Sequence, residues 1–111
     1  MIVTTGNEVS GRQIGEYLGV VRGIVVRAPS IPQKFFGSLK QIIGGQIQSY
    51  TDVCEEARRH AFDLMVTNAS RMGADAIIGM RYDATEFSMN VTEVLAYGTA
   101  VVVEPLGDDS Q

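Results

Sequence analysis

The sequence predicts an α+β fold: a three-stranded antiparallel sheet in β-α-β-β order, with a short extra N-terminal strand, packed on one long and one short helix. Three observations predict it. Residues 16–28 are rich in β-branched side chains and contain no series of helix formers. Residues 50–72 repeat apolar side chains at intervals close to 3.6. Residues 91–103 place small apolar side chains at every second position.

The first long strand is expected over residues 16–28, where Ala28-Pro29-Ser30 ends it. Its glycines follow a pattern, because Gly15, Gly19 and Gly23 share one parity and therefore one face. Either a neighbouring element approaches that face closely or the strand coils strongly there.

Two helices are expected to follow this strand. The short helix spans residues 31–43, is capped by Ser30 and is ended by Gly44-Gly45. Its inward side chains are Phe35, Phe36, Leu39, Ile42 and Ile43. The long helix runs from about Tyr50 to Met72, and Ser49 with Asp52 approximates a capping box at its start. Its inward side chains are Val53, Ala57, Ala61, Leu64, Met65 and Met72. Gly73 is expected to end the long helix in a left-handed conformation.

The remaining strands are expected over residues 74–83 and 91–103, joined by a hairpin connection over residues 84–90. A small apolar face on the last strand should receive the alanine side of the long helix, and it consists of Val94, Ala96, Gly98, Ala100 and Val102. Open edges along residues 16–28 and 91–103 would risk aggregation, which favours a closed homo-oligomer. The expected organisation is one domain over residues 1–105 and a flexible tail over residues 106–111.

Composition argues against several classes of function. With 9 Lys+Arg against 13 Asp+Glu, the net charge is -4 and the basic residues are scattered, so nucleic acid is not an expected partner. The longest apolar stretch, residues 18–26, is broken by Arg22 and is far shorter than the ~20 residues that span a membrane. A single Cys54 and an N-terminus without signal-peptide features predict a cytoplasmic protein.

An anion cradle is the first candidate site, with Gly44, Gly45, Ser49 and Tyr50 as its ligand-binding residues. Backbone N–H groups and the dipole at a helix N-terminus both favour negative charge. The alternative is that the glycines only permit a sharp turn between two helices.

A metal site is the second candidate, on the helix face of Glu56, His60 and Asp63. The alternative, which the scarcity of ligands favours, is a solvated face with an i,i+4 Glu-His pair. Cys54 is expected to be a buried thiol on the opposite, apolar side, although copies from several subunits could meet on a symmetry axis. We therefore expect no tight metal site within one subunit. No Gly-x-Ser-x-Gly elbow accompanies His60, so no catalytic residues are assigned.

Three arginines, Arg22, Arg27 and Arg81, lie within expected strands. Pairing with carboxylates across a subunit interface is favoured over lining a central opening, and the carboxylates considered are Glu16, Asp83 and Glu93.

Several motifs stand in an order and spacing that resemble the YbjQ-like family over nearly the whole chain. They are Gly19-Val20-Val21, Phe35-Phe36, Ile43-Gly44-Gly45, Tyr50, Ala57-Arg58, residues 73–79 (GADAIIG) and Gly98-Thr99-Ala100-Val101. These small bacterial and archaeal proteins have no assigned function and are often labelled heavy-metal-binding. The resemblance implies a dodecin-like α+β subunit that assembles as a ring-shaped pentamer. The chain departs from the family at Gln46-Ile47, where an Arg is usual, and at Ala84-Thr85, where a Tyr-Glu pair is usual.

The sequence and the resemblance together favour a non-catalytic cytosolic homo-oligomeric ring, pentameric by resemblance, that binds a small ligand or a metal ion at subunit boundaries. A purely structural or protein-interaction ring is the alternative, and an enzyme is less favoured.

Overall fold

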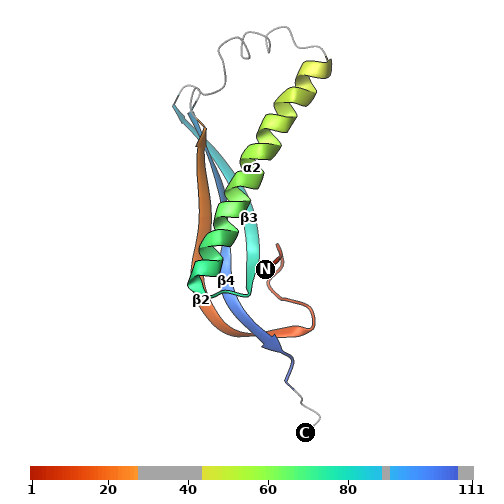
Figure 1. The fold of residues 1–111 in the computed structure, drawn as a ribbon, viewed down its shortest axis with the longest axis vertical. Coiled ribbons are helices and arrows are strands. Elements are labelled where there is room, and N and C mark those ends of the chain that lie inside the picture. Colours follow the sequence, from red (N-terminus) through yellow and green to blue (C-terminus); the bar gives the residue numbers. More distant parts are fainter. Residues whose placement is uncertain (28–43, 89–90, 108–111) are drawn as a thin grey trace.

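A computed structural model describes residues 1–27, 44–88 and 91–107 of the chain, and for residues 44–51, 87 and 88 it describes the backbone alone. Four strands and one helix are found in these ranges: β1 (Ile2–Val3), β2 (Arg12–Arg27), α2 (Gly44–Met72), β3 (Ala76–Ser88) and β4 (Val91–Pro105). The long helix lies across one face of a curved sheet (Figure 1). The predicted α+β class is therefore confirmed, whereas the short helix expected over residues 31–43 lies outside the described residues.

The sheet has four strands in the order β1-β3-β4-β2. β4 pairs antiparallel with both β2 and β3, and β1 pairs parallel with β3 through Ile2↔Ala76 and Val3↔Ile77. The sheet is therefore mixed, because the N-terminal strand that joins its edge runs in the same direction as β3.

The open edges of this sheet differ from those expected. β4 lies between β3 and β2, so the prediction that residues 91–103 form an exposed edge is wrong. The β3–β4 hairpin places β4 inward, and the N-terminal segment pairs with β3 up to Met80, where the Met80 amide donates to Thr4 O at 3.0 Å. Within the described chain, the unpaired edges are that of β2 and that of β3 beyond Met80.

Each long strand extends further than its local sequence predicts. β3 continues through residues 84–88, which were expected to form the hairpin connection, because Thr85 and Glu86 pair with Glu93 and Thr92 of β4. β2 begins at Arg12 and β4 ends at Pro105 for the same reason, since these two residues pair with each other. Strand length is thus set by cross-strand pairing rather than by β propensity alone.

The helix also begins earlier than expected, at Gly44 instead of Tyr50. Gly44 and Gly45 are helical in the structure, so the predicted turn at the two glycines is wrong. A glycine in a helix is unfavourable by only about 1 kcal/mol relative to alanine, which is too little to end a helix by itself.

A narrow stripe of three alanines and one methionine brings α2 onto the sheet. Ala57, Ala61, Met65 and Ala69 follow one another at four-residue intervals and are almost fully buried. They pack against residues of β2, β3 and β4, namely Val21, Val25, Ile77, Met80, Val94, Ala96 and Ala100. The predicted small apolar face of β4 is confirmed at Val94, Ala96, Gly98 and Ala100, which are buried, whereas Val102 is half-buried. On the helix, Met72 was expected to point inward but is exposed.

The expected close approach occurs at Gly23. A Cβ there would lie 2.1 Å from Ala61 O and 2.4 Å from Met65 N, so the helix backbone rests directly on the strand. The register between β2 and β4 shifts near the other two glycines, between Ile14 and Glu16 and again between Tyr17 and Gly19. Such bulges bend a strand, and β2 curves in this region (Figure 1). Close approach and coiling therefore both occur, at different glycines.

The C-terminus of α2 is closed by Gly73, as predicted. Gly73 has φ +88°, its amide donates to Ser70 O, and the Ala74 amide donates to Ala69 O, each at 3.0 Å. These two bonds form a Schellman motif.

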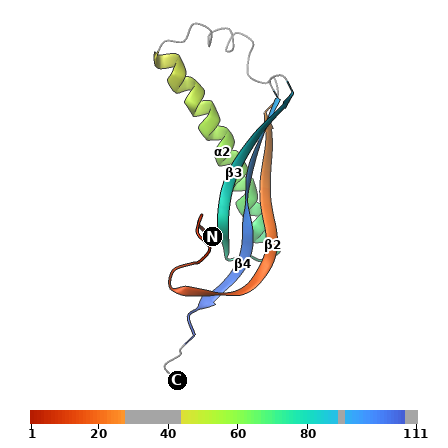
Figure 2. The same ribbon diagram turned by 180° about the vertical axis from the view of Figure 1, so that it is seen from behind.

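Among the described residues, the sheet face opposite α2 is covered at one end, by the N-terminal segment (Figure 2). There a second cluster joins the N-terminal segment to β3 and β4 and consists of Val9, Ala76, Ile78, Val101 and Val103. Further along β2 the same face exposes Val20 (73%), Ile24 (42%) and Val26 (54%). This row of apolar side chains on an edge strand is an unusual surface to leave in water.

Candidate ligand-binding groove

The predicted anion cradle falls in the first two turns of α2. Gly44, Gly45, Ser49 and Tyr50 all lie within the helix, but their side chains are outside the described part of the structure. The cradle therefore stays a prediction.

The predicted metal face is solvent-exposed. Glu56, His60 and Asp63 are all exposed, and across the described residues no group of three or more His, Cys, Asp or Glu side chains could hold a metal ion. Cys54 is also exposed, so its prediction as a buried thiol is wrong. The buried stripe of α2 runs through Ala57 and Ala61, and Cys54 lies three positions before Ala57, about 60° away around the helix.

The strand arginines have separate surroundings. Arg81 Nη1 donates to Thr5 O and Met80 O, each at 2.8 Å, and so ties β3 to the N-terminal segment of its own chain. Arg22 is exposed, and its carbonyl accepts a 2.8 Å bond from Asn68 Nδ2 of α2. Arg27 lines a cavity between α2 and the sheet. Their pairing across a subunit interface remains a prediction.

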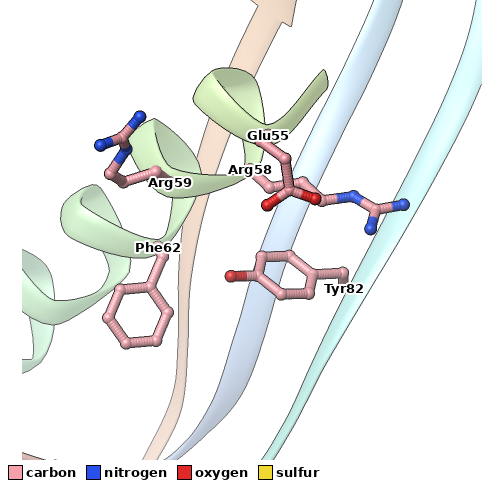
Figure 3. Close-up of a pocket in the computed structure, with 5 residues that line it drawn as sticks. All are labelled: Glu55, Arg58, Arg59, Phe62 and Tyr82. Atoms are coloured by element: carbon pink, nitrogen blue, oxygen red, sulfur yellow. The ribbon is translucent and has the colours of Figure 1, made fainter. Parts of the chain in front are cut away.

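A groove between α2 and β3 gathers charged and aromatic side chains in one place (Figure 3). Its volume is about 490 Å³ and its lining consists of Glu55, Arg58, Arg59, Phe62 and Tyr82. The four helical residues follow the i, i+3, i+4, i+7 spacing that forms one face of a helix. Tyr82 reaches the same space because its register partner is Ala96, which is buried on the sheet face under α2.

Arg58 and Tyr82 form the centre of the groove. Arg58 Cζ lies 5.8 Å from the centroid of the Tyr82 ring, within the range of a cation–π interaction. Glu55 and Arg58 both extend toward Tyr82, whereas Arg59 points away from it (Figure 3). The arginine that stacks on the ring keeps its guanidinium edge available for an anion.

The surroundings of Tyr82 keep its hydroxyl protonated. Partial burial raises the pKa of Tyr82 above its ordinary value of 10.0, and the negative charges of Glu55 and Asp63 add to that rise. The positive charge of Arg58 acts in the opposite direction. At neutral pH the Tyr82 hydroxyl is therefore a hydrogen-bond donor and not a base.

The lining holds two guanidinium groups, of which Arg58 faces Tyr82 and Arg59 points away from it, and one carboxylate, Glu55. Asp63 adds a second negative charge close enough to act on Tyr82. The Phe62 and Tyr82 rings supply apolar, flat surfaces beside these charges. A planar anion can satisfy both features, because guanidinium binds carboxylate or phosphate and the rings stack on a flat body. The charge and the rings together thus favour an anionic ligand with an aromatic or planar body.

Sequence reasoning missed this groove. Charged side chains such as Glu55, Arg58 and Arg59 on a helix usually mark a solvated face, so this spacing by itself does not indicate a site. Tyr82 is 20 residues beyond Phe62 in the chain, and only the β3–β4 register turns it toward the helix. The available signal in the sequence was an aromatic residue, Tyr82, in the strand that follows a helix bearing Arg58 and Arg59.

The fold and groove define a class: small α+β proteins in which one long helix crosses a sheet and carries arginines beside it. Within the described ranges, none of the helical segments combines the length and apolar character that crossing a bilayer requires. The YbjQ family model, described as "Putative heavy-metal-binding", matches residues 1–104. The chain belongs to this family.

Relatives confirm this assignment across almost the whole chain. A UPF0145 protein of Legionella pneumophila strain Philadelphia 1 is 52% identical over 103 residues, which cover 93% of this chain and 98% of that protein. A UPF0145 protein of Chromobacterium violaceum is 52% identical over 105 residues, covering 95% of this chain and 90% of the relative.

A solved structure shares the fold. A protein of unknown function from the DUF74 family of Pediococcus pentosaceus superposes with a TM-score of 0.62 at 19% identity, covering 94% of this chain and 98% of that chain. At this identity the likeness supports the fold alone.

Proposed function

We propose that this protein is a non-catalytic, cytosolic, self-associating binding subunit that takes a small anionic ligand in the groove between α2 and β3. The observation that carries the proposal is the stacking of Arg58 on Tyr82 at 5.8 Å, with Arg59 and Phe62 on the same groove. This arrangement supplies charge and flat apolar surface together, which are the two requirements of a planar anion.

We propose a binding role rather than catalysis because of the kinds of side chain that line the groove. Its lining holds no Ser, Cys, Thr, Lys or His, and the raised pKa of Tyr82 argues against its use as a base at neutral pH. Glu55 is the single carboxylate in the lining. Binding and orientation, rather than proton transfer, are what these side chains are suited to.

Self-association is supported by the uncovered sheet face. Tyr17 (66% exposed) extends the apolar row of Val20, Ile24 and Val26 on β2, whose edge is unpaired within the described chain. Burial of this row against other copies would remove both the apolar surface and the open edge from water. We propose a closed ring, with five subunits favoured by the family resemblance.

Metal binding, which the family description names, is the second candidate. The described residues of one chain contain no group of three ligands, so a metal would need side chains from several subunits. The exposed Cys54 is the thiol that such a shared site would use. A purely structural or protein-interaction ring is the third candidate.

Ligand titration tests the proposed groove. Phenyl phosphate serves as the probe, benzyl alcohol as its neutral counterpart, and calorimetry as the measurement. We expect phenyl phosphate to bind with one site per subunit and benzyl alcohol to bind at least about tenfold more weakly, because the charge-assisted bonds are lost. Arg58→Gln and Tyr82→Leu should each weaken phenyl phosphate binding.

A matched control separates the groove from general charge effects. Arg71→Gln removes an equal charge from the last turn of the same helix and should leave binding unchanged. Equal binding of the probe by the parent protein and Arg58→Gln, or equal binding of probe and alcohol, would contradict the proposal.

A further inference from the structure

A second cavity lies between α2 and the far end of the sheet, apart from the Arg58–Tyr82 groove. It has a volume of about 180 Å³ and is lined by Val53, Cys54 and Ala57 of the helix together with Arg27, Ala84, Thr92 and Val94 of the sheet. Most of this lining is apolar. Cys54 is exposed while lining the cavity, so it marks the opening to solvent.

Arg27 brings a positive charge into this apolar space. It follows the buried residues Val21, Gly23 and Val25 at two-residue intervals on β2, so its side chain lies on the sheet face under α2. Its Nε is fully buried, and in the structure it has no hydrogen-bond partner among the described residues. A buried N–H without a partner is unfavourable, and most native structures pair such groups.

No acidic side chain lines this cavity in the part of the chain that the structure describes. The polar residues of the lining are Cys54, Thr92 and Arg27 itself. The sequence between β2 and α2, residues 28–43, contains no Asp or Glu. The Arg27 guanidinium thus lies in an apolar cavity whose lining supplies no carboxylate. Such a cavity is suited to bind the acid group of a ligand.

We propose that this cavity binds a small carboxylic acid with a short aliphatic body. The carboxylate accepts hydrogen bonds from the Arg27 guanidinium, and the aliphatic part packs among Val53, Ala57 and Val94. With a volume of about 180 Å³, the cavity has room for the short aliphatic body of such an acid. This site is independent of the proposed Arg58–Tyr82 groove.

Calorimetric titration with butyrate, with butyramide as the neutral counterpart of the same shape, tests the proposal. We expect saturable butyrate binding with one site per subunit, and binding of butyramide about tenfold weaker or more. Bound butyrate should also slow the reaction of Cys54 with iodoacetamide, followed by mass spectrometry, because Cys54 lies at the opening.

Two variants test the residues. Arg27→Met keeps the length and apolar stem of the side chain and removes the charge, so butyrate binding should fall about tenfold or more while the melting temperature is kept or raised. Ala84→Leu fills the cavity from β3 and should abolish butyrate binding with Arg27 intact. Arg22→Met, on the exposed face of the same strand, is the matched control and should bind butyrate as the parent does.

Several results would overturn the proposal. One is the lack of saturable butyrate binding up to about 50 mM, and another is equal binding by the parent protein and Arg27→Met. A third is a lower subunit number in Arg27→Met. That result would mean that Arg27 pairs with a carboxylate of a second copy of the chain rather than with a ligand. Because Arg58→Gln leaves this cavity intact, loss of phenyl phosphate binding and loss of butyrate binding remain separable.

Discussion

Gly73 is the residue on which the end of α2 depends. Its φ of +88° lies in the left-handed region, where a β-branched side chain is strained by about 1 to 2 kcal/mol or more. Gly73→Val should therefore lower the melting temperature clearly, as measured by circular dichroism. Gly107→Val, beyond the end of β4, is the control and should melt like the parent. Equal stability of Gly73→Val and the parent would show that this conformation is not needed to end the helix.

Tyr82 reports on the electrostatics of the groove. Its pKa is raised by burial, so it should ionise above pH 10.0, measured as the difference in tyrosinate absorbance between the parent and Tyr82→Phe. Because the folded pKa is the higher one, the stability contributed by protonated Tyr82 is complete below the unfolded pKa and is lost as the pH rises through the folded pKa. Arg58→Gln should raise the pKa further, and Glu55→Gln should lower it. A decrease on Arg58→Gln would contradict the arrangement in Figure 3.

The contact of α2 with β2 depends on Gly23. An added Cβ would meet two backbone atoms of the helix, Ala61 O and Met65 N, and backbone atoms cannot move aside as a flexible side chain can. Gly23→Ala should destabilise the protein by about 1 to 3 kcal/mol, the range of overpacked cores, measured by urea unfolding. Gly6→Ala is the matched control, since its Cβ would only reach Thr4 Oγ1 at 3.5 Å. A Gly23→Ala protein as stable as the parent would mean that the helix does not lie this close.

The outer face of α2 carries the three candidate metal residues, Glu56, His60 and Asp63. We predict no tight site there, because a zinc ion needs three or four ligands at about 2.0 to 2.3 Å. Calorimetric titration of zinc, copper and nickel into metal-free protein checks this. Submicromolar binding abolished by His60→Ala would contradict the prediction. Loss of such binding in Cys54→Ser instead would indicate a site shared between subunits.

Some parts of the helices and strands can be predicted from neighbouring residues in the sequence, and others cannot. The strand centres and the Gly73 end of α2 follow from β-branched composition and from one glycine, which are local signals. The strand ends depend on partners such as Arg12 and Pro105, which are far apart in the chain. The groove depends on the β3–β4 register that orients Tyr82, and a single sequence does not encode register in any short motif.

Among the described residues, much of one sheet face is uncovered, and the edges of β2 and of β3 beyond Met80 are unpaired. Val20, Ile24 and Val26 present β-branched side chains on β2, whose edge is open in the described chain. Val20→Lys and Ile24→Lys place charges in this row without touching the core under α2. We expect these changes together to lower the subunit number, measured by light scattering after size exclusion. If the double variant keeps the parent's subunit number, this face is not the interface.

Native mass spectrometry of the protein purified from its own cells tests the central claim, a ligand-binding ring, most directly. With a chain of 12.0 kDa, five subunits predict a single species of about 60 kDa. We expect additional mass from a retained small ligand, and we expect Arg58→Gln to keep the subunit number while losing that mass. A monomer with the mass of the bare chain at micromolar concentration would contradict the account.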